Sequence, residues 1–106
     1  MASGTAHNHL VLTGSLVKSP QLKRSPAGVQ HLQLVVEHRS EQIEAGLPRQ
    51  SYLRIQAIAS GDWVKDWANQ LQLGDVVELT GFLQRHQTAN GVSKLVLHAQ
   101  TLKQVY

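Results

Sequence analysis

Positive charges and aromatic rings are the first candidates for chemistry in this sequence, because the usual catalytic patterns do not occur in it. It contains no cysteine, which excludes a thiol nucleophile, a disulfide and a thiolate zinc site. The patterns G-x-S-x-G, G-x-x-x-x-G-K-[ST] and H-E-x-x-H do not occur either, so nothing points to acyl transfer, a phosphate-binding loop or a zinc peptidase. We therefore predict that the protein is not an enzyme and needs no cofactor.

A metal site is the next possibility, because the sequence has six histidines. Only His7 and His9 lie close together in the chain, and no carboxylate follows them at ligand spacing. A zinc site needs three or four converging ligands. The acidic residues Glu37, Glu41 and Glu44 could coordinate a cation, but they are better explained as residues that keep a loop solvated. We predict no metal site.

The basic residues are more informative. Ten Lys and Arg against seven Asp and Glu give a formal charge of +3. This excess is compatible with a nucleic-acid partner, although a solvated basic surface is the alternative because Lys and Arg are exposed in most proteins. The basic residues fall in the first loop, on or near the middle strands, and around the last hairpin: Lys18, Lys23, Arg24, Arg39, Arg49, Arg54, Arg85 and Lys94.

Tyr52 is the aromatic residue best placed to bind a ligand. It falls on the outward side of a predicted strand with Arg54 and Gln56, where a nucleobase could stack on its ring for about 1–3 kcal/mol. The alternative is a ring that covers the edge of the sheet while its hydroxyl reaches water. Trp63 and Trp67 have helical spacing instead, and we expect them to anchor a helix to the core.

Alternating apolar residues predict three strands in the first part of the chain, over residues 10–17, 29–39 and 49–59. Gly14 lies within the first strand, and Pro and Gly mark a turn region over residues 18–28. Residues 40–48 are polar and contain Gly46, so they are expected to form a flexible loop. The predicted inward residues are Leu10, Leu12, Leu16, Leu32, Leu34, Val36, His38, Leu53, Ile55, Ala57 and Ala59.

A short helix and a hairpin follow. The spacing of Trp63, Val64, Trp67 and Leu71 predicts an amphipathic helix over residues 63–71, capped by Ser60 or Asp62. Two further strands surround a loop over residues 85–93, where Asn90-Gly91 predicts a type I′ turn. Gly81 within the first of these strands predicts a bulge or bend. The predicted inward residues of the hairpin are Val77, Leu79, Leu83, Leu95, Leu97 and Ala99.

Five strands with a short helix between the third and fourth indicate an all-β OB-fold barrel. At 106 residues the chain is one domain, which we place at residues 9–106 after a flexible tail, residues 1–8. No apolar run approaches the ~20 residues that span a bilayer, and the N-terminus does not resemble a signal peptide, so we expect a cytoplasmic protein. In an OB-fold, strands two and three and the flanking loops form an oligonucleotide groove, which would bring the scattered basic residues to one side.

Several motifs resemble a known family. They are Ser25-Pro26-Ala27-Gly28, the run over residues 34–40, Glu44-Ala45-Gly46 with Arg49-Gln50, and the run over residues 89–99. Glu37-His38-Arg39-Ser40 and Asn90-Gly91-Val92-Ser93-Lys94 are the most specific. Over residues 9–102 the chain resembles primosomal replication protein N, a bacterial family related to single-stranded-DNA-binding protein.

The resemblance implies a homodimeric OB-fold protein that binds single-stranded DNA in the nucleoid and associates with a replication-restart helicase and a helicase-loader protein. It places Lys23, Arg39, Arg49 and Lys94 on the family's basic DNA-contacting positions and Tyr52 on its stacking aromatic position. Leu47 stands where the family can carry an exposed aromatic, and Gln87-Thr88-Ala89 lacks lysines that some members carry. The predicted DNA site consists of Lys23, Arg39, Leu47, Arg49, Tyr52, Arg54, Arg85 and Lys94. The alternative is an OB-fold adaptor between proteins whose contact with DNA is weak or incidental.

Overall fold

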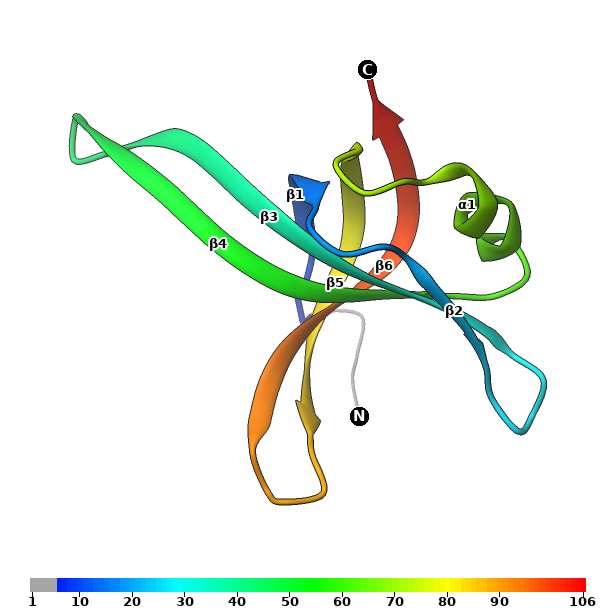
Figure 1. Cartoon of the computed structure of the whole chain (residues 1–106). Coiled ribbons are helices and arrows are strands. Elements are labelled where there is room, and N and C mark those ends of the chain that lie inside the picture. The colour runs from blue at the N-terminus through cyan, green and yellow to red at the C-terminus, as the bar shows by residue number, and fades with distance from the viewer. Residues whose placement is uncertain (1–5) are drawn as a thin grey trace.

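The computed structural model describes residues 6–106, which form six strands and one short helix (Figure 1). In chain order these are β1 (Leu10–Leu16), β2 (Gln21–Arg24), β3 (Gln30–Glu44), β4 (Leu47–Ser60), α1 (Val64–Gln70), β5 (Val76–Gln87) and β6 (Ser93–Val105). The short strand β2 lies within the region predicted as a turn, because its residues pair with β3 from Gln21↔Gln33 to Arg24↔Gln30. The helix lies between β4 and β5, after the third of the predicted strands.

The strands close into a five-stranded barrel. They are hydrogen-bonded in the order β1-β5-β6-β4-β3-β2, and β1 also pairs with β3 through Ser15↔Glu37 and Leu16↔Val36. This second pairing joins β1, at one end of the sheet, to β3 and so closes the barrel, while β2 pairs only with another part of β3. The pairing of β4 with β6 is parallel and the others are antiparallel. The predicted OB-fold is confirmed.

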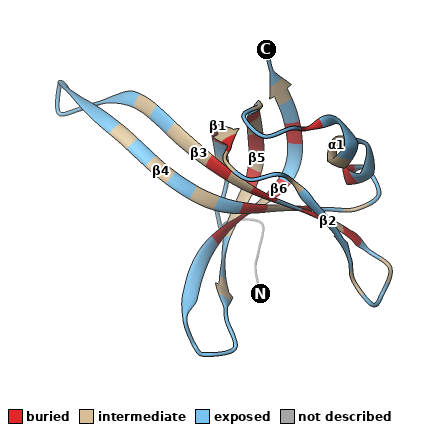
Figure 2. Cartoon of the chain, in the orientation of Figure 1, coloured by how far each residue is buried: buried red, intermediate tan, exposed pale blue. Residues whose placement is uncertain are grey.

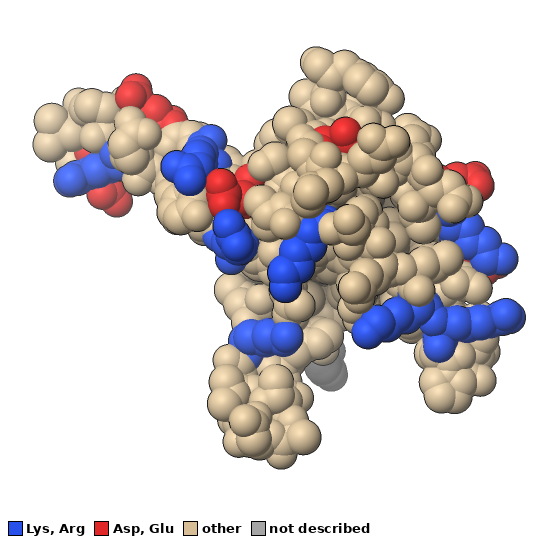
Figure 3. Space-filling model, in the orientation of Figure 1, with Lys and Arg blue, Asp and Glu red and all other residues tan. Residues whose placement is uncertain are grey.

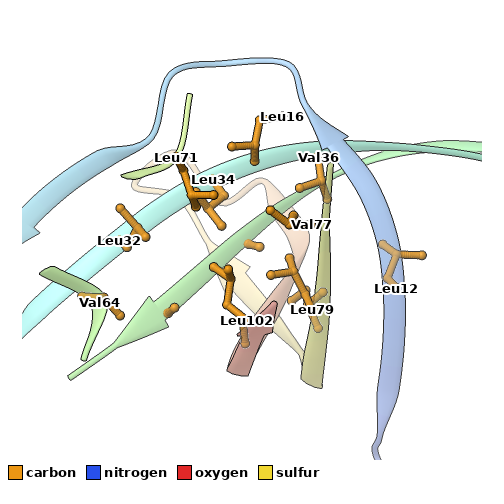
Figure 4. Packing of buried hydrophobic residues seen from close by; sticks show 14 residues of the cluster. Leu12, Leu16, Leu32, Leu34, Val36, Val64, Leu71, Val77, Leu79 and Leu102 are labelled. Atoms are coloured by element: carbon orange, nitrogen blue, oxygen red, sulfur yellow. The ribbon is translucent and has the colours of Figure 1, made fainter. Parts of the chain in front are cut away.

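The core fills the barrel and extends beneath the helix. Figure 4 shows side chains from the strands and from the helix region converging on one interior. Most of the predicted inward residues lie in or against this core, and Leu32, Leu79 and Leu97 have no exposed surface. Burying a leucine of this kind stabilises the fold by about 1.5–3 kcal/mol. In Figure 2 the buried segments lie where the strands overlap, whereas the hairpin ends are exposed.

Two glycines allow the strands to approach each other at the points where the barrel bends. A Cβ atom on Gly14 would lie 2.7 Å from the carbonyl oxygen of Glu37, on the strand that β1 crosses. A Cβ on Gly81 would overlap the carbonyl oxygen of His98. The register between β5 and β6 shifts between Thr80 and Gly81, so the predicted bulge is confirmed.

The predicted flexible loop over residues 40–48 is wrong. Strands β3 and β4 continue through it and pair as far as Glu44↔Leu47, and they form an arm, residues 39–52, that projects from the barrel (Figure 1). The turn is the two residues Ala45 and Gly46, with φ of 53° and 75°. Two consecutive positive φ angles are what a type I′ turn requires. The polar composition reflects two solvated sides of the arm and not a lack of structure.

The Asn90-Gly91 turn differs from the predicted type I′ geometry. Only Gly91 has a positive φ, 84°. The Gly91 amide donates to Thr88 O at 3.0 Å, and the Thr88 amide donates to Val92 O at 2.8 Å. This is the pattern of a three-residue loop in which glycine follows a type I turn. The predicted loop over residues 85–93 is therefore too long, since β5 reaches Gln87 and β6 begins at Ser93.

The helix is formed where expected, but its start differs. Its N-cap is Trp63 and has no side-chain capping bond, so the predicted caps Ser60 and Asp62 are wrong. Val64 and Leu71 are buried and Trp67 packs against the core. Trp63 is 38% exposed and lies outside the core cluster, so packing against the core is seen for Trp67 and not for Trp63.

The ends of the barrel explain two further differences. Leu95 has the predicted parity but is 55% exposed, because the β5–β6 hairpin extends past the barrel there. Asn8, in the predicted tail, is bonded to β5: its side chain donates to Leu83 O and accepts from the Leu83 amide at 2.8 and 2.9 Å. The rest of that prediction, residues 1–5, lies outside the described residues. Within residues 6–106, no helix combines the length and apolar character needed to cross a membrane.

We predict that Gly81→Ala lowers the free energy of unfolding by about 2–4 kcal/mol, because the new methyl group would meet backbone that cannot move without breaking the β5–β6 pairing. Gly46→Ala is the matched control. Its Cβ would meet no atom within 4 Å, so only the positive φ is penalised, at about 1–2 kcal/mol. Chemical denaturation of both variants measures the difference. Equal losses would show that the contact at Gly81 relaxes freely.

Candidate nucleic-acid interface

One side of the barrel wall is defined by alternate residues of β3 and β4 that point away from the core. We call it the outer face. Partners directly opposite in the register share a face of the sheet, and on β3 and β4 these outward pairs are Arg39↔Tyr52, Glu37↔Arg54, Val35↔Gln56 and Gln33↔Ile58. The sequence reasoning assigned the same outward parity to Tyr52, Arg54 and Gln56, and the buried partners Ala57 and Ala59 confirm it.

The outer face continues onto β6 and β5. Gln56 is the register partner of Val96 and Ile58 that of His98. Across the next pair of strands, Phe82 lies opposite His98 and His86 opposite Lys94. Lys94 therefore points to the outer face, with parity opposite to that of Leu95 and Leu97. Four strands thus contribute to one surface.

A groove crosses this surface at an angle to the strands. One hollow of about 120 Å³ is lined by Lys18, Gln21 and Val35 together with Gln33 and Gln56. A second, of about 110 Å³, is lined by His86, Lys94 and Val96 together with the same two glutamines. Because the hollows share Gln33 and Gln56, they form one path from the β1–β2 loop to the β5–β6 hairpin, with a lysine at each end.

The structure divides the predicted DNA-contacting residues between two sides. Lys23, Arg39, Tyr52, Arg54 and Lys94 lie on the outer face, Lys23 as the partner of His31. Figure 3 shows Lys and Arg side chains spread over the arm, the base of the β5–β6 hairpin and the β2–β3 hairpin.

The other three predicted residues have the opposite parity. Leu47 pairs with Glu44, Arg49 with Gln42 and Arg85 with Leu95. Arg49 also forms an ion pair with Glu44 at 3.3 Å. A ligand in the groove would therefore meet Lys94 and Arg54 from the outer face, and would have to pass around the arm or the hairpin to reach these three.

Glu37 connects the aromatic and basic residues of the outer face. Its carboxylate accepts hydrogen bonds from Arg54 Nη2 at 2.8 Å, from Arg39 Nε at 3.1 Å and from the Tyr52 hydroxyl at 3.1 Å. The Arg39 guanidinium also lies 4.3 Å from the centre of the Tyr52 ring, a cation–π distance. The bonds from Arg54 and then Arg39 hold the pKa of Glu37 below its usual value. One carboxylate thus orients two guanidinium groups and a ring.

This arrangement has two opposing effects on the binding of an anionic ligand. The carboxylate holds Arg39, Tyr52 and Arg54 in place, which reduces the entropy lost when a ligand binds. It also cancels one of the two positive charges, and it would repel a phosphate. Tyr52 is 55% exposed, but Arg39 covers one side of its ring, so an incoming base must displace the guanidinium or use the other side.

Sequence reasoning did not include the residues that line the middle of the groove. The sequence analysis places Gln56 on the outward side of a strand without a role, does not single out Gln33, and gives Lys18 only as a basic residue of the first loop. Their side-by-side placement follows from the pairing Gln33↔Ile58 and Val35↔Gln56 and from the path of the β1–β2 loop. His86 is not among the predicted site residues. Only an outward position on a strand could have indicated Gln33 and Gln56, because glutamine side chains carry no charge that would single them out in the sequence.

Two histidines on the outer face interact closely. His86 Nε2 and His98 Nε2 are 2.7 Å apart, so one nitrogen donates and the other accepts. Burial and then the nearby His86 lower the pKa of His98, which favours its neutral form. Over residues 6–106, no group of three or more His, Asp or Glu side chains is placed to hold a metal ion.

Comparison with known proteins identifies the class. Residues 8–101 match a family described as another single-strand binding protein family. The wild-type single-stranded DNA binding protein from Thermus aquaticus has a similar fold, with a TM-score of 0.79 over 94% of this chain and 50% of that chain, at 20% identity. The chain is thus an OB-fold protein of the single-strand binding class.

Closer relatives specify the family within this class. The replication restart protein PriB of Proteus mirabilis is 48% identical over 91% of both chains. The solved structure of the PriB protein from Ralstonia solanacearum has a TM-score of 0.77 and 26% identity, and covers 95% of this chain and 100% of that one. The chain belongs to the replication restart protein PriB family, which confirms the resemblance seen in the sequence.

We predict that Glu37→Gln strengthens binding to a single-stranded oligonucleotide at low salt. The amide keeps an acceptor oxygen but removes the charge, so the outer face gains one net positive charge. The slope of log K against log salt should become steeper by up to about 0.7, the value for one phosphate on a single strand. Fluorescence anisotropy across a salt series measures both quantities.

Glu44→Gln is the matched control, because Glu44 pairs with Arg49 on the opposite side of the arm. It should change the slope less than Glu37→Gln does. If Glu37→Gln instead weakens binding while the protein melts normally, the carboxylate matters more for orienting the arginines than for repelling phosphate.

Proposed function

We propose that this protein binds single-stranded DNA across its outer face during bacterial replication restart and acts as a binding protein, not as a catalyst. The observation that carries the proposal is the groove between Lys18 and Lys94, which runs over Gln33 and Gln56. Lysines can pair with phosphates along such a path, and the amides offer donors and acceptors to bases of any kind. Membership of a single-strand binding family supports the same conclusion.

The arm adds a second contact region. Arg54 and Tyr52 follow Gln56 at successive outward positions of β4, so a strand that leaves the groove along β4 meets them next. Stacking on Tyr52 would contribute about 1–3 kcal/mol. We infer that DNA extends from the groove onto the arm.

We further propose that the protein bridges DNA, a replication-restart helicase and a helicase-loader protein, acting in the cytoplasm at the nucleoid. The name shared by its relatives, replication restart protein PriB, supports a place in this process. A protein adaptor with weak DNA binding is the second candidate. The pairing of Glu37 with both Arg39 and Arg54 favours it, because it leaves fewer free charges for phosphate, and the hairpin tip Gln87-Thr88-Ala89 has no charge of its own.

The test of DNA binding is a salt titration with a dT oligonucleotide. We expect Lys94→Ala to lower the slope of log K against log salt by about 0.7, as one phosphate contact on a single strand requires. Arg85→Ala is the matched control: it removes one charge from the same hairpin but from the opposite side, so its effect on the slope should be smaller. Folding stability should hardly change in either variant, since both side chains are exposed.

Two results would argue against the groove. Equal slopes for the wild type and Lys94→Ala would mean that DNA does not pass Lys94. A wild-type protein that shows no measurable binding at low salt would favour the adaptor, and a pull-down with the restart helicase would then be the decisive experiment.

We infer that the protein forms a symmetric dimer through β1. One edge of β1 pairs with β5 from Leu10 to Ser15, whereas on the other edge only Ser15 and Leu16 pair with β3. Within residues 6–106, residues 10–14 therefore have no strand partner on this edge, where the Thr13 carbonyl accepts a hydrogen bond from His38 Nδ1 at 2.6 Å. Val11, one of these residues, is 52% exposed. An unpaired edge of this kind readily pairs with another chain, and twofold symmetry is the commonest arrangement.

Sedimentation at micromolar protein concentration should show a dimer for the wild type. Val11→Lys should shift the population towards monomer, because a charge on an edge strand opposes pairing. Val29→Lys, which adds the same charge at an exposed position next to the β2–β3 turn, should remain dimeric. A monomeric wild type, or equal effects of the two substitutions, would count against the β1 interface.

A further inference from the structure

An aromatic pocket lies on the outer face beyond the end of the groove. It is an open hollow with a volume of about 350 Å³. Three rings line it, from Trp63, Phe82 and His98, together with Ile58. Ser60 and Gln100 supply polar groups. The rings come from the helix N-terminus, β5 and β6, so the pocket exists only in the folded barrel.

The Trp63 side chain is fixed without being buried. Its indole Nε1 donates a hydrogen bond to Ser60 O at 2.9 Å, and Gly61 allows the ring to lie against the backbone. A Cβ on Gly61, which has a φ of +122°, would come within 2.9 Å of Trp63 Cδ1. The ring is held in one orientation and is still 38% exposed. A fixed, accessible aromatic surface is suited to stacking, because little side-chain entropy is lost on binding.

The opposite wall is also ordered. Phe82 and His98 stack with ring centres 5.0 Å apart and planes 9° from parallel. His98 in turn is bonded to His86 at 2.7 Å. This chain of contacts fixes the positions of both rings, so the pocket is already formed without a ligand.

The pocket is continuous with the groove. Ile58 lines both the pocket and the hollow that contains Lys94, and the bonded histidines lie one in each, His86 in the hollow and His98 in the pocket. Along β4 the outward residues run Tyr52, Arg54, Gln56, Ile58. At about 3.3 Å per residue, Tyr52 and Ile58 are roughly 20 Å apart, a span compatible with the 4–16 nucleotides that one OB-fold binds.

We propose that the pocket of Trp63, Phe82 and His98 binds a nucleobase of the same single strand that occupies the groove. This inference rests on the proposed function. It adds a second stacking site next to Ile58, at the other end of the row of outward β4 residues that begins with Tyr52. A base fits this surface better than a phosphate does, because the pocket walls are rings and an isoleucine and the lysine lies in the neighbouring hollow. Stacking tolerates any base, and Gln100 can satisfy polar atoms on a base edge.

Tryptophan fluorescence tests contact directly. The chain has two tryptophans, and Trp67→Phe leaves Trp63 as the only one. We expect a dT oligonucleotide to quench the fluorescence of this variant in step with binding measured by anisotropy of a label on the oligonucleotide. Binding without quenching would overturn the nucleobase site and leave DNA binding by the groove intact.

Substitution tests the energy of the contact. Trp63→Ala should weaken dT binding by about tenfold, the loss expected from one base–aromatic stack, with an unchanged salt slope because no phosphate contact is removed. Phe82→Leu should weaken binding in the same way while keeping apolar volume, which covers the case in which Trp63→Ala fails to fold. Leu73→Ala, which removes an exposed apolar side chain outside the pocket, is the matched control and should bind normally.

The outcomes separate this inference from the function on which it rests. If the wild type does not bind dT at low salt, the proposed function itself fails. If the wild type binds and both pocket variants bind equally well, only the pocket assignment is wrong, and a hydrophobic side chain of a protein partner becomes the better candidate for its occupant. A change of salt slope in Trp63→Ala would also overturn it, since stacking does not release counterions.

Discussion

The close approach of backbone at Gly14 and Gly81 is the constraint on which the rest of the structure depends. At these two positions a neighbouring strand occupies the space that a side chain would need. Gly14 lets β1 cross β3 and close the barrel. Gly81 lies at the bulge that bends β5 against β6. Because side chains alternate along a strand, a shift of register at either point would turn the outward residues of the following segment inwards. The composition of the outer face therefore depends on these backbone contacts.

The outer face combines two kinds of binding surface that differ in their electrostatics. In the groove, Lys18 and Lys94 lie at the ends of a path lined by uncharged amides. On the arm, Glu37 holds Arg39 and Arg54 and lowers the net charge. The Glu37 side chain is 16% exposed, but those of Arg39 and Arg54 are 71% and 54% exposed, so solvent and salt screen these ion pairs. Charge attracts DNA mainly to the groove, while the arm offers an oriented but partly neutralised surface.

Aromatic residues make up only 5% of this chain, and three of them lie on or beside the outer face. Trp67 packs against the core, whereas Tyr52, Trp63 and Phe82 lie on or beside the outer face. Each of these three is fixed by a neighbour: Tyr52 by Arg39 and Glu37, Trp63 by Ser60 and Phe82 by His98. Rings held in this way present flat apolar surface to a ligand at low entropic cost, which compensates in part for their small number.

The sequence by itself determined where five of the six strands lie, the inward or outward parity of most of their residues, and the family. Alternation in segments such as Leu32-Leu34-Val36 and Leu53-Ile55-Ala57 is local information, and Gly81 within an apolar strand marked the bulge. It also identified Tyr52, Arg54 and Gln56 as outward residues. These features depend on residues near one another in the chain, where the two-residue period of a strand applies directly.

Tertiary structure decided which outward residues meet. Residues 40–48 have the polar composition of a loop but form most of the arm, because both sides of these strands are solvated. Glu37 binds Arg54 across 17 residues of sequence, and the groove joins Lys18 to Lys94 only because β6 pairs with β4. Trp63 had the helical spacing of a core residue, but the helix begins after it and leaves the ring beside Phe82 and His98. Such contacts are set by strand order and barrel closure, and residues distant in sequence carry no local pattern that reveals them.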